Sequence, residues 1–301
     1  MSLLSSSPIL ADSKKLAKKK SFKQPLKSIV KSPLKWAGGK RKLIIDIEKL
    51  IPASSSRSRL IEPFVGGGSV FLNMQFANYF LVDSNPDLIA LFTHIKNNHT
   101  QFLKVAERLF SIENNQASQY YELRREFNAT PHSLRRSVLF LYLNRHGYNG
   151  LCRYNSKGIY NVPFGRYKKP YFPSTEIAYF AQRAVDAALV AGDFSLAFDA
   201  ALPSDIIYCD PPYTPINETS SFTAYSGQGF LYRDQQRLVK CALNAQQKGI
   251  TSIVSNHDLP VTRELYSKAD KIISLNVARS ISCKGQVRKP CAELIAIYKG
   301  C

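Results

Sequence analysis

The sequence predicts an α/β protein whose sheet is interrupted by a mostly helical insertion that carries a hairpin. Short apolar runs bounded by turns alternate with amphipathic stretches at both ends of the chain, as in a sheet covered by helices. From residue 101 to 143 the pattern is helical with charged faces, and no alternating strand pattern appears until after Asn144. The 301 residues, 45 % of them hydrophobic, suffice for one large domain or two modest ones.

Five strands are predicted, each an apolar run that ends at a turn: residues 60–61, 80–82, 206–209, 251–255 and 293–298. Helices are predicted at 43–50, 69–77, 87–97 and 235–247. Three strands end at chemically suggestive residues: a glycine-rich turn, Asp83 and Asp210. Because ligands bind at the carboxyl ends of strands in an open α/β sheet, we expect these ends to form one cleft.

The first strand end reads E-P-F-V-G-G-G-S, residues 62–69. Its glycines allow a ligand to approach the backbone, although the pattern matches neither a dinucleotide fingerprint nor a phosphate-binding loop. Asp83 ends the next strand, where a carboxylate can accept hydrogen bonds from both hydroxyls of a ribose. The alternative is that Asp83 caps the helix that begins near Asp87.

The third strand end, Y-C-D-P-P-Y at residues 208–213, is the most specific chemical signal. Its prolines fix the backbone and present carbonyl groups, Asp210 adds an acceptor, and Tyr213 adds an aromatic face. The group fits an exocyclic amine whose two hydrogens are held by Asp210 and the Pro211 carbonyl. A plain strand-terminating turn is the alternative.

The charge is strongly positive: 41 Lys and Arg against 22 Asp and Glu give +19, which favours a polyanionic partner. Residues 1–31 hold eight Lys and one Asp, and we expect a flexible basic arm that either solvates the N-terminus or adds phosphate contacts. No apolar run is long enough to span a membrane, and the six cysteines lack zinc-ligand spacing. We therefore expect a soluble protein with free thiols, no secretory signal and no metal.

Residues 127–175 contain eight Arg or Lys and no carboxylate. Six tyrosines, and the four asparagines at 144, 149, 155 and 161, are interleaved with these charges in a glycine-punctuated stretch. Arg and Asn read base edges, Tyr stacks or wedges, and Lys neutralises phosphate, so the stretch predicts a nucleic-acid contact. A tyrosine-rich hairpin packed on the body is the alternative, and it leaves the missing carboxylates unexplained.

Six motifs follow one another along the chain: K-W-A-G-G-K (35–40), E-P-F-V-G-G-G-S (62–69), V-D-S-N (82–85), N-R-H-G-Y-N-G-L-C-R-Y-N (144–155), C-D-P-P-Y (209–213) and S-N-H-D (255–258). In order and spacing they resemble the deoxyadenosine N6-methyltransferases of the Dam type, which modify adenine in GATC. The resemblance covers about residues 33–299. It implies a Rossmann-like sheet that binds S-adenosyl-L-methionine (AdoMet), a helical target-recognition insertion with a β-hairpin, and a flipped adenine as substrate. His146 departs from the pattern, in which a tyrosine is common at this position.

The resemblance also implies roles at the AdoMet site. Trp36 would lie beside the sulfonium and Lys40 beside the methionine carboxylate. The turn at 64–68 would pass beneath the methionine part, Asp83 would hold the ribose, and residues 193–194 would flank the cofactor adenine. The expected cofactor-binding residues are Trp36, Lys40, Phe64, Gly66, Gly68, Asp83, Asp193, Phe194 and Asp210, and the expected catalytic residues are Asp210, Pro211, Pro212 and Tyr213.

For the DNA, Arg153 is expected to contact guanine O6 and N7, and Tyr148 to fill the gap left by the flipped adenine. Lys168 and Lys169 are expected to bind phosphate only. The expected DNA-binding residues are Lys35, Arg145, Tyr148, Asn149, Leu151, Arg153, Tyr154, Tyr167, Lys168 and Lys169.

The predicted organisation is an arm at 1–31, an AdoMet-binding catalytic domain at 32–86 and 174–301, and a DNA target-recognition domain at 87–173. We expect a monomer on double-stranded DNA, cytoplasmic and nucleoid-associated, with S-adenosyl-L-homocysteine (AdoHcy) as the product and no membrane partner. N4-cytosine, RNA or protein-glutamine methylation remain alternatives, because D-P-P-Y would also serve those amines. A non-catalytic DNA-binding protein of the same fold is the other alternative. The intact D-P-P-Y, Lys40 and glycine turn argue against it.

Overall fold

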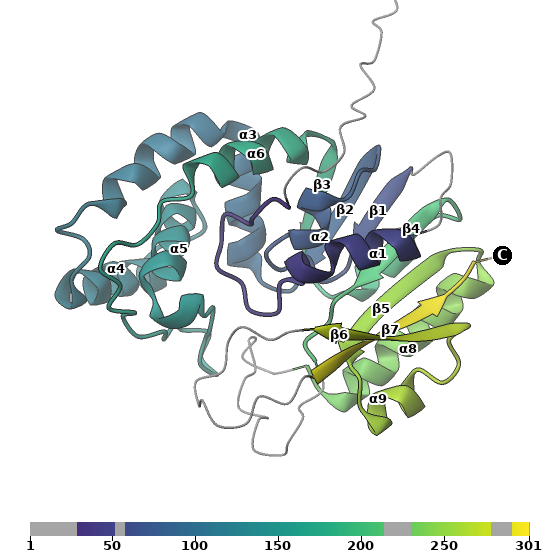
Figure 1. Cartoon of the computed structure of the whole chain (residues 1–301). Helices are drawn as coiled ribbons and strands as arrows, with labels where there is room; N and C mark the ends of the chain where they lie inside the picture. The colour runs from purple at the N-terminus through teal and green to yellow at the C-terminus, as the bar shows by residue number, and fades with distance from the viewer. Residues whose placement is uncertain (1–28, 52–57, 214–229, 278–290, 301) are drawn as a thin grey trace, which may run out of the picture.

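The computed structural model describes residues 29–51, 58–213, 230–277 and 291–300. Its strands are β1 (Arg59–Glu62), β2 (Asn78–Asp83), β3 (Ala187–Ala191), β4 (Asp205–Cys209), β5 (Thr251–His257), β6 (Lys271–Val277) and β7 (Cys291–Tyr298). They form one sheet in the order β3-β2-β1-β4-β5-β7-β6 (Figure 1). The five strands from β3 to β5 in this order are parallel, and β7 is antiparallel to both of its neighbours.

All five predicted strands are present, and the α/β class is confirmed. The sequence prediction missed two strands. β3 reads A-A-L-V-A, and its three alanines give a weak strand signal. β6 reads K-I-I-S-L-N-V and stands at the other edge of the sheet.

The helices cover both faces of the sheet and build the insertion. The α-helices are α1 (Ile44–Leu50), α2 (Ser69–Asn73), α3 (Pro86–Glu107), α4 (Ala117–Ala129), α5 (Leu134–His146), α6 (Ser174–Arg183), α7 (Ser195–Asp199), α8 (Tyr232–Gln247) and α9 (Pro260–Leu265). Short 3₁₀ turns lie at η1 (Lys40–Leu43), η2 (Arg108–Phe110), η3 (Tyr148–Gly150) and η4 (Ala184–Asp186). The predicted helix at 69–77 is shorter than expected, because the backbone becomes extended at Met74.

Alternating side chains of the strands enter two different cores. Leu60, Leu81 and Tyr208 lie in one core, whereas their neighbours Ile61 and Val82 lie in the other. The first core continues into the helical part of α3–α6, which lies beside the sheet in Figure 1. The helical part therefore shares a core with the sheet.

The predicted hairpin is present in reduced form. Tyr154 and Tyr160 form an isolated antiparallel bridge, and the Asn155 N–H donates to the carbonyl of Ile159 at 2.9 Å. A second isolated bridge joins Gly147 to Phe164. The segment is thus a turn fixed by single bridges, without a continuous ladder between 147 and 164.

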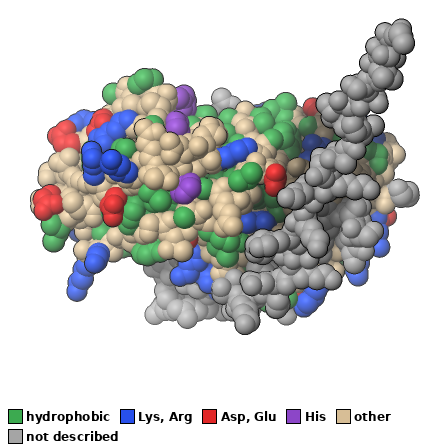
Figure 2. Space-filling view, turned by 90° about the horizontal axis from the view of Figure 1, so that it is seen from above, with side chains coloured by type: hydrophobic (Ala, Val, Ile, Leu, Met, Phe, Trp, Pro, Cys, Tyr) green, Lys and Arg blue, Asp and Glu red, His purple; other side chains and the backbone are tan. Residues whose placement is uncertain are grey.

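The surface of the helical part does not carry one sign of charge throughout. Figure 2 shows Lys and Arg side chains interspersed with Asp and Glu on the face seen there. The absence of carboxylates is therefore a property of segment 127–175. No helix in the part of the chain that is described has the length and apolar character needed to cross a membrane.

Candidate active site

The structure brings three carboxylates together at the carboxyl ends of three neighbouring strands. β1 lies between β2 and β4 and is parallel to both, so the three strands end side by side. Glu62 ends β1, Asp83 ends β2, and Asp210 directly follows β4. The three acidic residues therefore lie close together at the carboxyl ends of the strands, where ligands of open α/β sheets bind.

The glycine turn after β1 accommodates Trp36. Gly66 and Gly68 have positive φ angles of 47° and 71°. A Cβ atom at Gly66 would lie 2.6 Å from Nε1 of Trp36, and one at Gly67 would lie 2.8 Å from Trp36 Cβ. Sequence reasoning explained these glycines by the approach of a ligand. In the structure, the space at Gly66 and Gly67 holds the indole.

Asp83 links this turn to the residues that precede α3. Oδ2 accepts from the Gly66 N–H at 2.9 Å, and Oδ1 accepts from the Asn85 N–H at 3.0 Å. Burial raises the pKa of Asp83 above its usual 3.8, against the opposing effect of these two bonds. The side chain of Asn85, and not Asp83, caps α3 by accepting from the N–H groups of Asp87 and Leu88.

An aromatic cluster lies beside the acidic strand ends. Phe64 and Phe194 stack with centroids 5.3 Å apart, and Phe230 meets Phe64 edge-on. Arg237 covers the ring of Phe194 at 4.3 Å and pairs with Asp193 at 2.5 Å. The structure thus brings the expected residues 64, 193 and 194 together with two that the sequence did not indicate.

Asp210 is oriented by two donors. The Lys40 ammonium lies 2.8 Å from Asp210 Oδ1, and the Ser255 hydroxyl donates to the same oxygen at 3.1 Å. Lys40 is buried, with 4 % of its side chain exposed, and also donates to the carbonyl of Gly38. Sequence reasoning had placed Lys40 at the methionine carboxylate, whereas the structure has its ammonium on Asp210.

Tyr213 is held at its hydroxyl and at its ring. The hydroxyl donates to Glu293 Oε2 at 3.1 Å, and the His257 ring meets the Tyr213 ring edge-on at 4.6 Å. Lys40 Nζ lies 4.5 Å from the centroid of the same ring. Burial and the charges of Asp210 and Glu293 raise the pKa of Tyr213 well above its usual 10, so its hydroxyl remains a donor.

Some residues of the site were missed by sequence reasoning. Ser255 and His257 belong to the S-N-H-D motif, which carried no assigned role. Glu293 interrupts the apolar strand C-A-E-L-I-A-I-Y, and a lone carboxylate in such a run was an available signal. Gln235 donates to the Pro212 carbonyl at 2.8 Å and ties the D-P-P-Y segment to α8.

The expected DNA-binding residues fall into two groups. Most are at least partly exposed and lie on the loops around η3 or, in the case of Lys35, against them: Lys35, Tyr148, Asn149, Leu151, Arg153, Tyr167, Lys168 and Lys169. Arg145 is 7 % exposed and donates two hydrogen bonds to the carbonyl of Pro33. The Tyr154 hydroxyl donates to Asp87 at 2.7 Å, and its ring packs on Tyr160. Arg145 and Tyr154 thus support the loop from inside.

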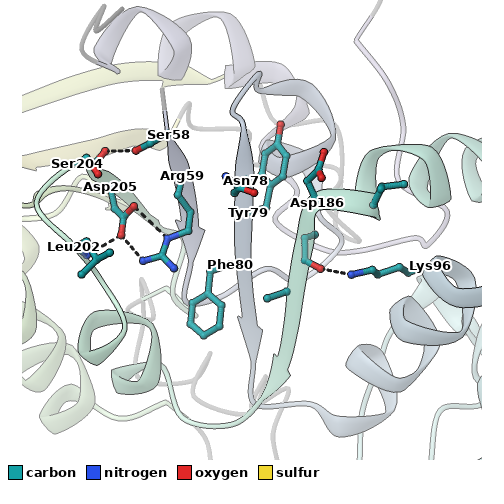
Figure 3. A pocket seen from close by; sticks show the side chains of 13 residues that line it. Ser58, Arg59, Asn78, Tyr79, Phe80, Lys96, Asp186, Leu202, Ser204 and Asp205 are labelled. Atoms are coloured by element: carbon teal, nitrogen blue, oxygen red, sulfur yellow. Dashed lines mark hydrogen bonds and ion pairs between the residues drawn. The ribbon is translucent and has the colours of Figure 1, made fainter. Parts of the chain in front are cut away.

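A cavity of about 600 Å³ lies at the opposite end of the strands, where β1 to β4 begin (Figure 3). Three of its four charged side chains are already bonded: Arg59 pairs with Asp205 at 2.5 Å, and Lys96 donates to the Ala187 carbonyl at 2.7 Å. The fourth, Asp186, is exposed. Ligands of such sheets bind at the carboxyl ends of the strands. We therefore place the candidate active site at the carboxyl ends of the strands, beside Asp210.

The class of protein follows from comparison with known families. The model of the D12 class N6 adenine-specific DNA methyltransferases matches residues 36–281. The chain belongs to this family, so it is an adenine-specific DNA methyltransferase with a Rossmann-like sheet, as the sequence predicts.

Relatives match over nearly their full length. Proteins named DNA adenine methylase from Salmonella typhi and from Escherichia coli strain K12 are each 47 % identical over 266 residues, 88 % of this chain and 94 % of theirs. The one from Haemophilus influenzae is 46 % identical over 283 residues, 93 % of this chain and 97 % of its own. The solved human methyltransferase 10 domain containing protein aligns with 85 % of this chain and 80 % of its own, at a TM-score of 0.39 and 10 % identity, which is too low to support an inference.

Proposed function

We propose that this chain transfers the methyl group of AdoMet to N6 of an adenine within GATC, after that adenine has left the stack of double-stranded DNA. The observation that carries the proposal is the arrangement after β4, where Asp210 is oriented by Lys40 and Ser255 beside the fixed ring of Tyr213. The enzyme would act as a monomer in the cytoplasm of its cell.

The residues at the strand ends fit AdoMet in charge and shape. Glu62 Oε1 is buried and has no hydrogen-bond partner among the residues described, so its carboxyl can receive a cationic group of the cofactor. Asp83 would hold the ribose, and the cluster of Phe64, Phe194 and Asp193 would flank the adenine. Bound there, AdoMet supplies an activated methyl group.

The D-P-P-Y segment would hold the target amine. Both protein donors occupy Oδ1 of Asp210, so we assign Oδ2 to one N6 hydrogen and the Pro211 carbonyl to the other. Gln235 donates a hydrogen bond to the Pro212 carbonyl, which keeps that segment in place. Tyr213 would stack on the flipped base. Positioning supplies most of the acceleration, and a strong general base is not required because the amine loses its proton only as the new bond forms.

The loops around η3 would read and hold the DNA. Tyr148 is 46 % exposed, which suits a wedge that replaces the flipped base in the stack. Arg153 is exposed and would contact a guanine, while Lys168 and Lys169 would bind phosphate. Arg145 and Tyr154 would act indirectly by supporting these loops.

The test is expression in a host that lacks DNA methylation, followed by modification-aware sequencing of its DNA. The wild-type chain should place N6-methyladenine in GATC. Asp210→Ala should lower methyl transfer about 100-fold or more, because it removes an oriented acceptor at the reacting group. Asp186→Ala changes an exposed aspartate near the other end of the sheet and should leave the modification intact.

Three results would contradict the proposal. N4-methylcytosine in place of N6-methyladenine would favour the cytosine alternative. Adenine methylation outside GATC would overturn the target sequence alone. If Asp210→Ala retained more than about a tenth of the wild-type rate, the assignment of the amine site would be wrong.

A further inference from the structure

Asn144, near the end of α5, joins the segment before Trp36 to the loop that follows α5. Its Oδ1 accepts from the Lys35 N–H at 2.8 Å, and its Nδ2 donates to the Lys35 carbonyl at 2.8 Å. Nδ2 also donates to the carbonyl of Gly150 at 3.0 Å. The side chain is 1 % exposed, so these bonds form inside the protein, where an unpaired partner would be costly.

Lys35 in turn lies against the loop of η3. Its ammonium donates to the carbonyl of Arg145 and lies 3.6 Å from the centroid of the Tyr167 ring. A Cβ atom at Gly150 would lie 2.2 Å from Lys35 Cβ, so the two residues are in direct contact. Gly150 has a φ of 63° and Asn149 a φ of 53°, the left-handed region that a non-glycine residue rarely adopts. The neighbouring segment thus helps to hold the loop in an unusual shape.

On the other side, the next residue contacts the cofactor turn. Trp36 fills the space beside Gly66 and Gly67, and the Gly66 N–H is bonded to Asp83. Two consecutive residues therefore touch two sites, Lys35 the DNA-facing loop and Trp36 the cofactor turn. Packing this close leaves little room for one site to shift without the other.

We infer that Asn144 is a positioning residue that couples occupancy of the cofactor site to the binding of DNA. The inference rests on the proposed function of these two sites. AdoMet bound at the turn fixes Trp36 and Lys35, and Asn144 transmits that position to the loop of Tyr148 and Asn149. If bound cofactor raises the affinity for DNA by a certain factor, then bound DNA must raise the affinity for the cofactor by the same factor.

The chain offers a matched control in Asn128 of α4. Its Oδ1 accepts from the Tyr160 N–H at 2.9 Å, and its Nδ2 donates to the Tyr160 carbonyl at 3.1 Å. The pairing is the same as that of Asn144 with Lys35, but it joins α4 to the hairpin and includes no residue of the cofactor segment. Replacing Asn128 therefore removes a similar pair of hydrogen bonds but leaves the contacts between Asn144, Lys35 and Trp36 intact.

The experiment measures the dissociation constant of a GATC duplex by fluorescence anisotropy, with and without saturating AdoHcy as a non-reacting probe. In the wild-type chain AdoHcy should tighten DNA binding by a factor in the range of about 5 to 150. In Asn144→Ala this factor should fall to within about twofold of one, and in Asn128→Ala it should keep its wild-type value. Asn144→Asp places a carboxylate oxygen against the carbonyls of Lys35 and Gly150, where it repels them, so its factor should fall at least as far as that of Asn144→Ala.

An unchanged factor in Asn144→Ala would overturn the inference, and so would an equal loss of the factor in Asn128→Ala. A merely structural role would lower the DNA affinities with and without AdoHcy alike and leave their ratio unchanged. A wild-type factor of one would overturn it too, yet leave the proposed function standing. The proposed function would fail instead if the wild-type chain bound neither AdoHcy nor DNA.

If Asn144→Ala does not fold, hydrogen exchange of the wild-type chain decides the matter. Added AdoHcy should slow exchange in a peptide that covers residues 147–151, without DNA, and leave a peptide that covers 117–129 unchanged. Equal exchange in the loop peptide with and without AdoHcy would overturn the inference.

Discussion

Glu62 ends β1 inside the protein, where burial raises the pKa of its carboxyl well above the usual 4.5 and the charge of Asp210 raises it further. The backbone N–H of Phe71 donates to this carboxyl and partly opposes the shift. Above pH 4.5 the unfolded chain releases the proton that the folded chain retains. The stability that this group contributes is therefore present below about pH 4.5 and is lost as the pH rises toward the raised pKa.

Glu62→Gln should consequently stabilise the free protein and weaken its cofactor site. We expect a higher melting temperature than wild type at pH 7.5, with the difference shrinking toward pH 5. AdoMet should bind about 10- to 100-fold more weakly, since a hydrogen bond to a charged group contributes about 1.5 to 3 kcal/mol. Thermal denaturation and titration calorimetry measure the two effects.

The control for this change is Glu264→Gln, which alters an exposed residue of α9 and should affect neither quantity. Unchanged AdoMet affinity in Glu62→Gln would show that the buried carboxyl does not face the cofactor.

Sequence reasoning identified Asp83 and Asp210 because each ends an apolar run, a local signal that needs no knowledge of the fold. Glu293 could not be placed in the same way. It reaches Tyr213 only because β7 is inserted next to β5, a pairing between distant segments that no local pattern encodes.

At the scale of elements, the loop after α5 holds Arg153 in a hydrogen bond that the proposed guanine contact would have to replace. Its Nε donates to Asn161 Oδ1 at 2.7 Å across the base of the hairpin. A paired contact with guanine can compete with this bond, at a gain of about 1 to 3 kcal/mol in discrimination. Arg153→Ala should therefore relax methylation toward sites altered at one guanine, as measured on duplexes that differ at single positions.

Lys169→Ala is the control, because Lys169 is exposed and is assigned to phosphate. It should weaken the binding of cognate and altered duplexes by the same factor. If Arg153→Ala behaves like Lys169→Ala, then Arg153 only contacts the backbone.

Within α5, His146 is buried with no hydrogen-bond partner for Nε2 in the described part of the chain. It stacks on Tyr142 at 3.9 Å and meets Phe110 at 4.9 Å. Burial, helped by the charge of the Lys35 ammonium, lowers the pKa of His146 to about 4, against the opposing effect of the bond to the Tyr142 carbonyl. Because the unfolded chain takes up this proton near pH 6.5, stability is lost as the pH falls from about 6.5 to about 4.

His146→Phe should remove this acid-dependent loss and keep the stacking. At pH 5 the wild-type chain should have lost about 2 kcal/mol of unfolding free energy through this group alone. Urea denaturation at pH 7.5 and pH 5 should thus show a smaller decrease for His146→Phe. Equal decreases in both proteins would mean that another group governs the acid sensitivity.

The elements that sequence reasoning found are those with a strong local pattern and a clear end, such as β4 before D-P-P-Y. β3 was missed because alanine carries little strand preference, and its place is set by pairing with β2. The hairpin was expected as two strands, yet its tyrosines direct their hydroxyls elsewhere: Tyr160 donates to the Leu151 carbonyl and Tyr154 to Asp87.

For the whole molecule, the basic arm adds to the net charge of +19. The Val30 N–H donates to Asn73 at 2.8 Å, so residue 30 belongs with the body although the predicted arm extended to residue 31. Deleting residues 1–28, which hold seven Lys and one Asp, removes a charge of 7 − 1 = +6. The slope of log affinity against log salt should become shallower by about 0.9 for each phosphate that the arm neutralises in the full-length chain.

Anisotropy titrations at several salt concentrations measure this slope, and the preference for GATC over altered duplexes should stay the same. An identical slope in the deleted and full-length chains would assign the arm to solvation of the N-terminus.

The strand order also sets a sequence of events during synthesis. β6 precedes β7 in the chain, yet β6 stands at the edge of the sheet and β7 lies between it and β5. A nascent chain that has completed β6 therefore has no neighbour for it, and the outer edge of β5 is also open. β7, which is synthesised last, pairs with both β5 and β6 and also brings Glu293 to Tyr213. A ribosome that stalls before β7 would thus release a chain that is both inactive and prone to pair with other chains through its open edges.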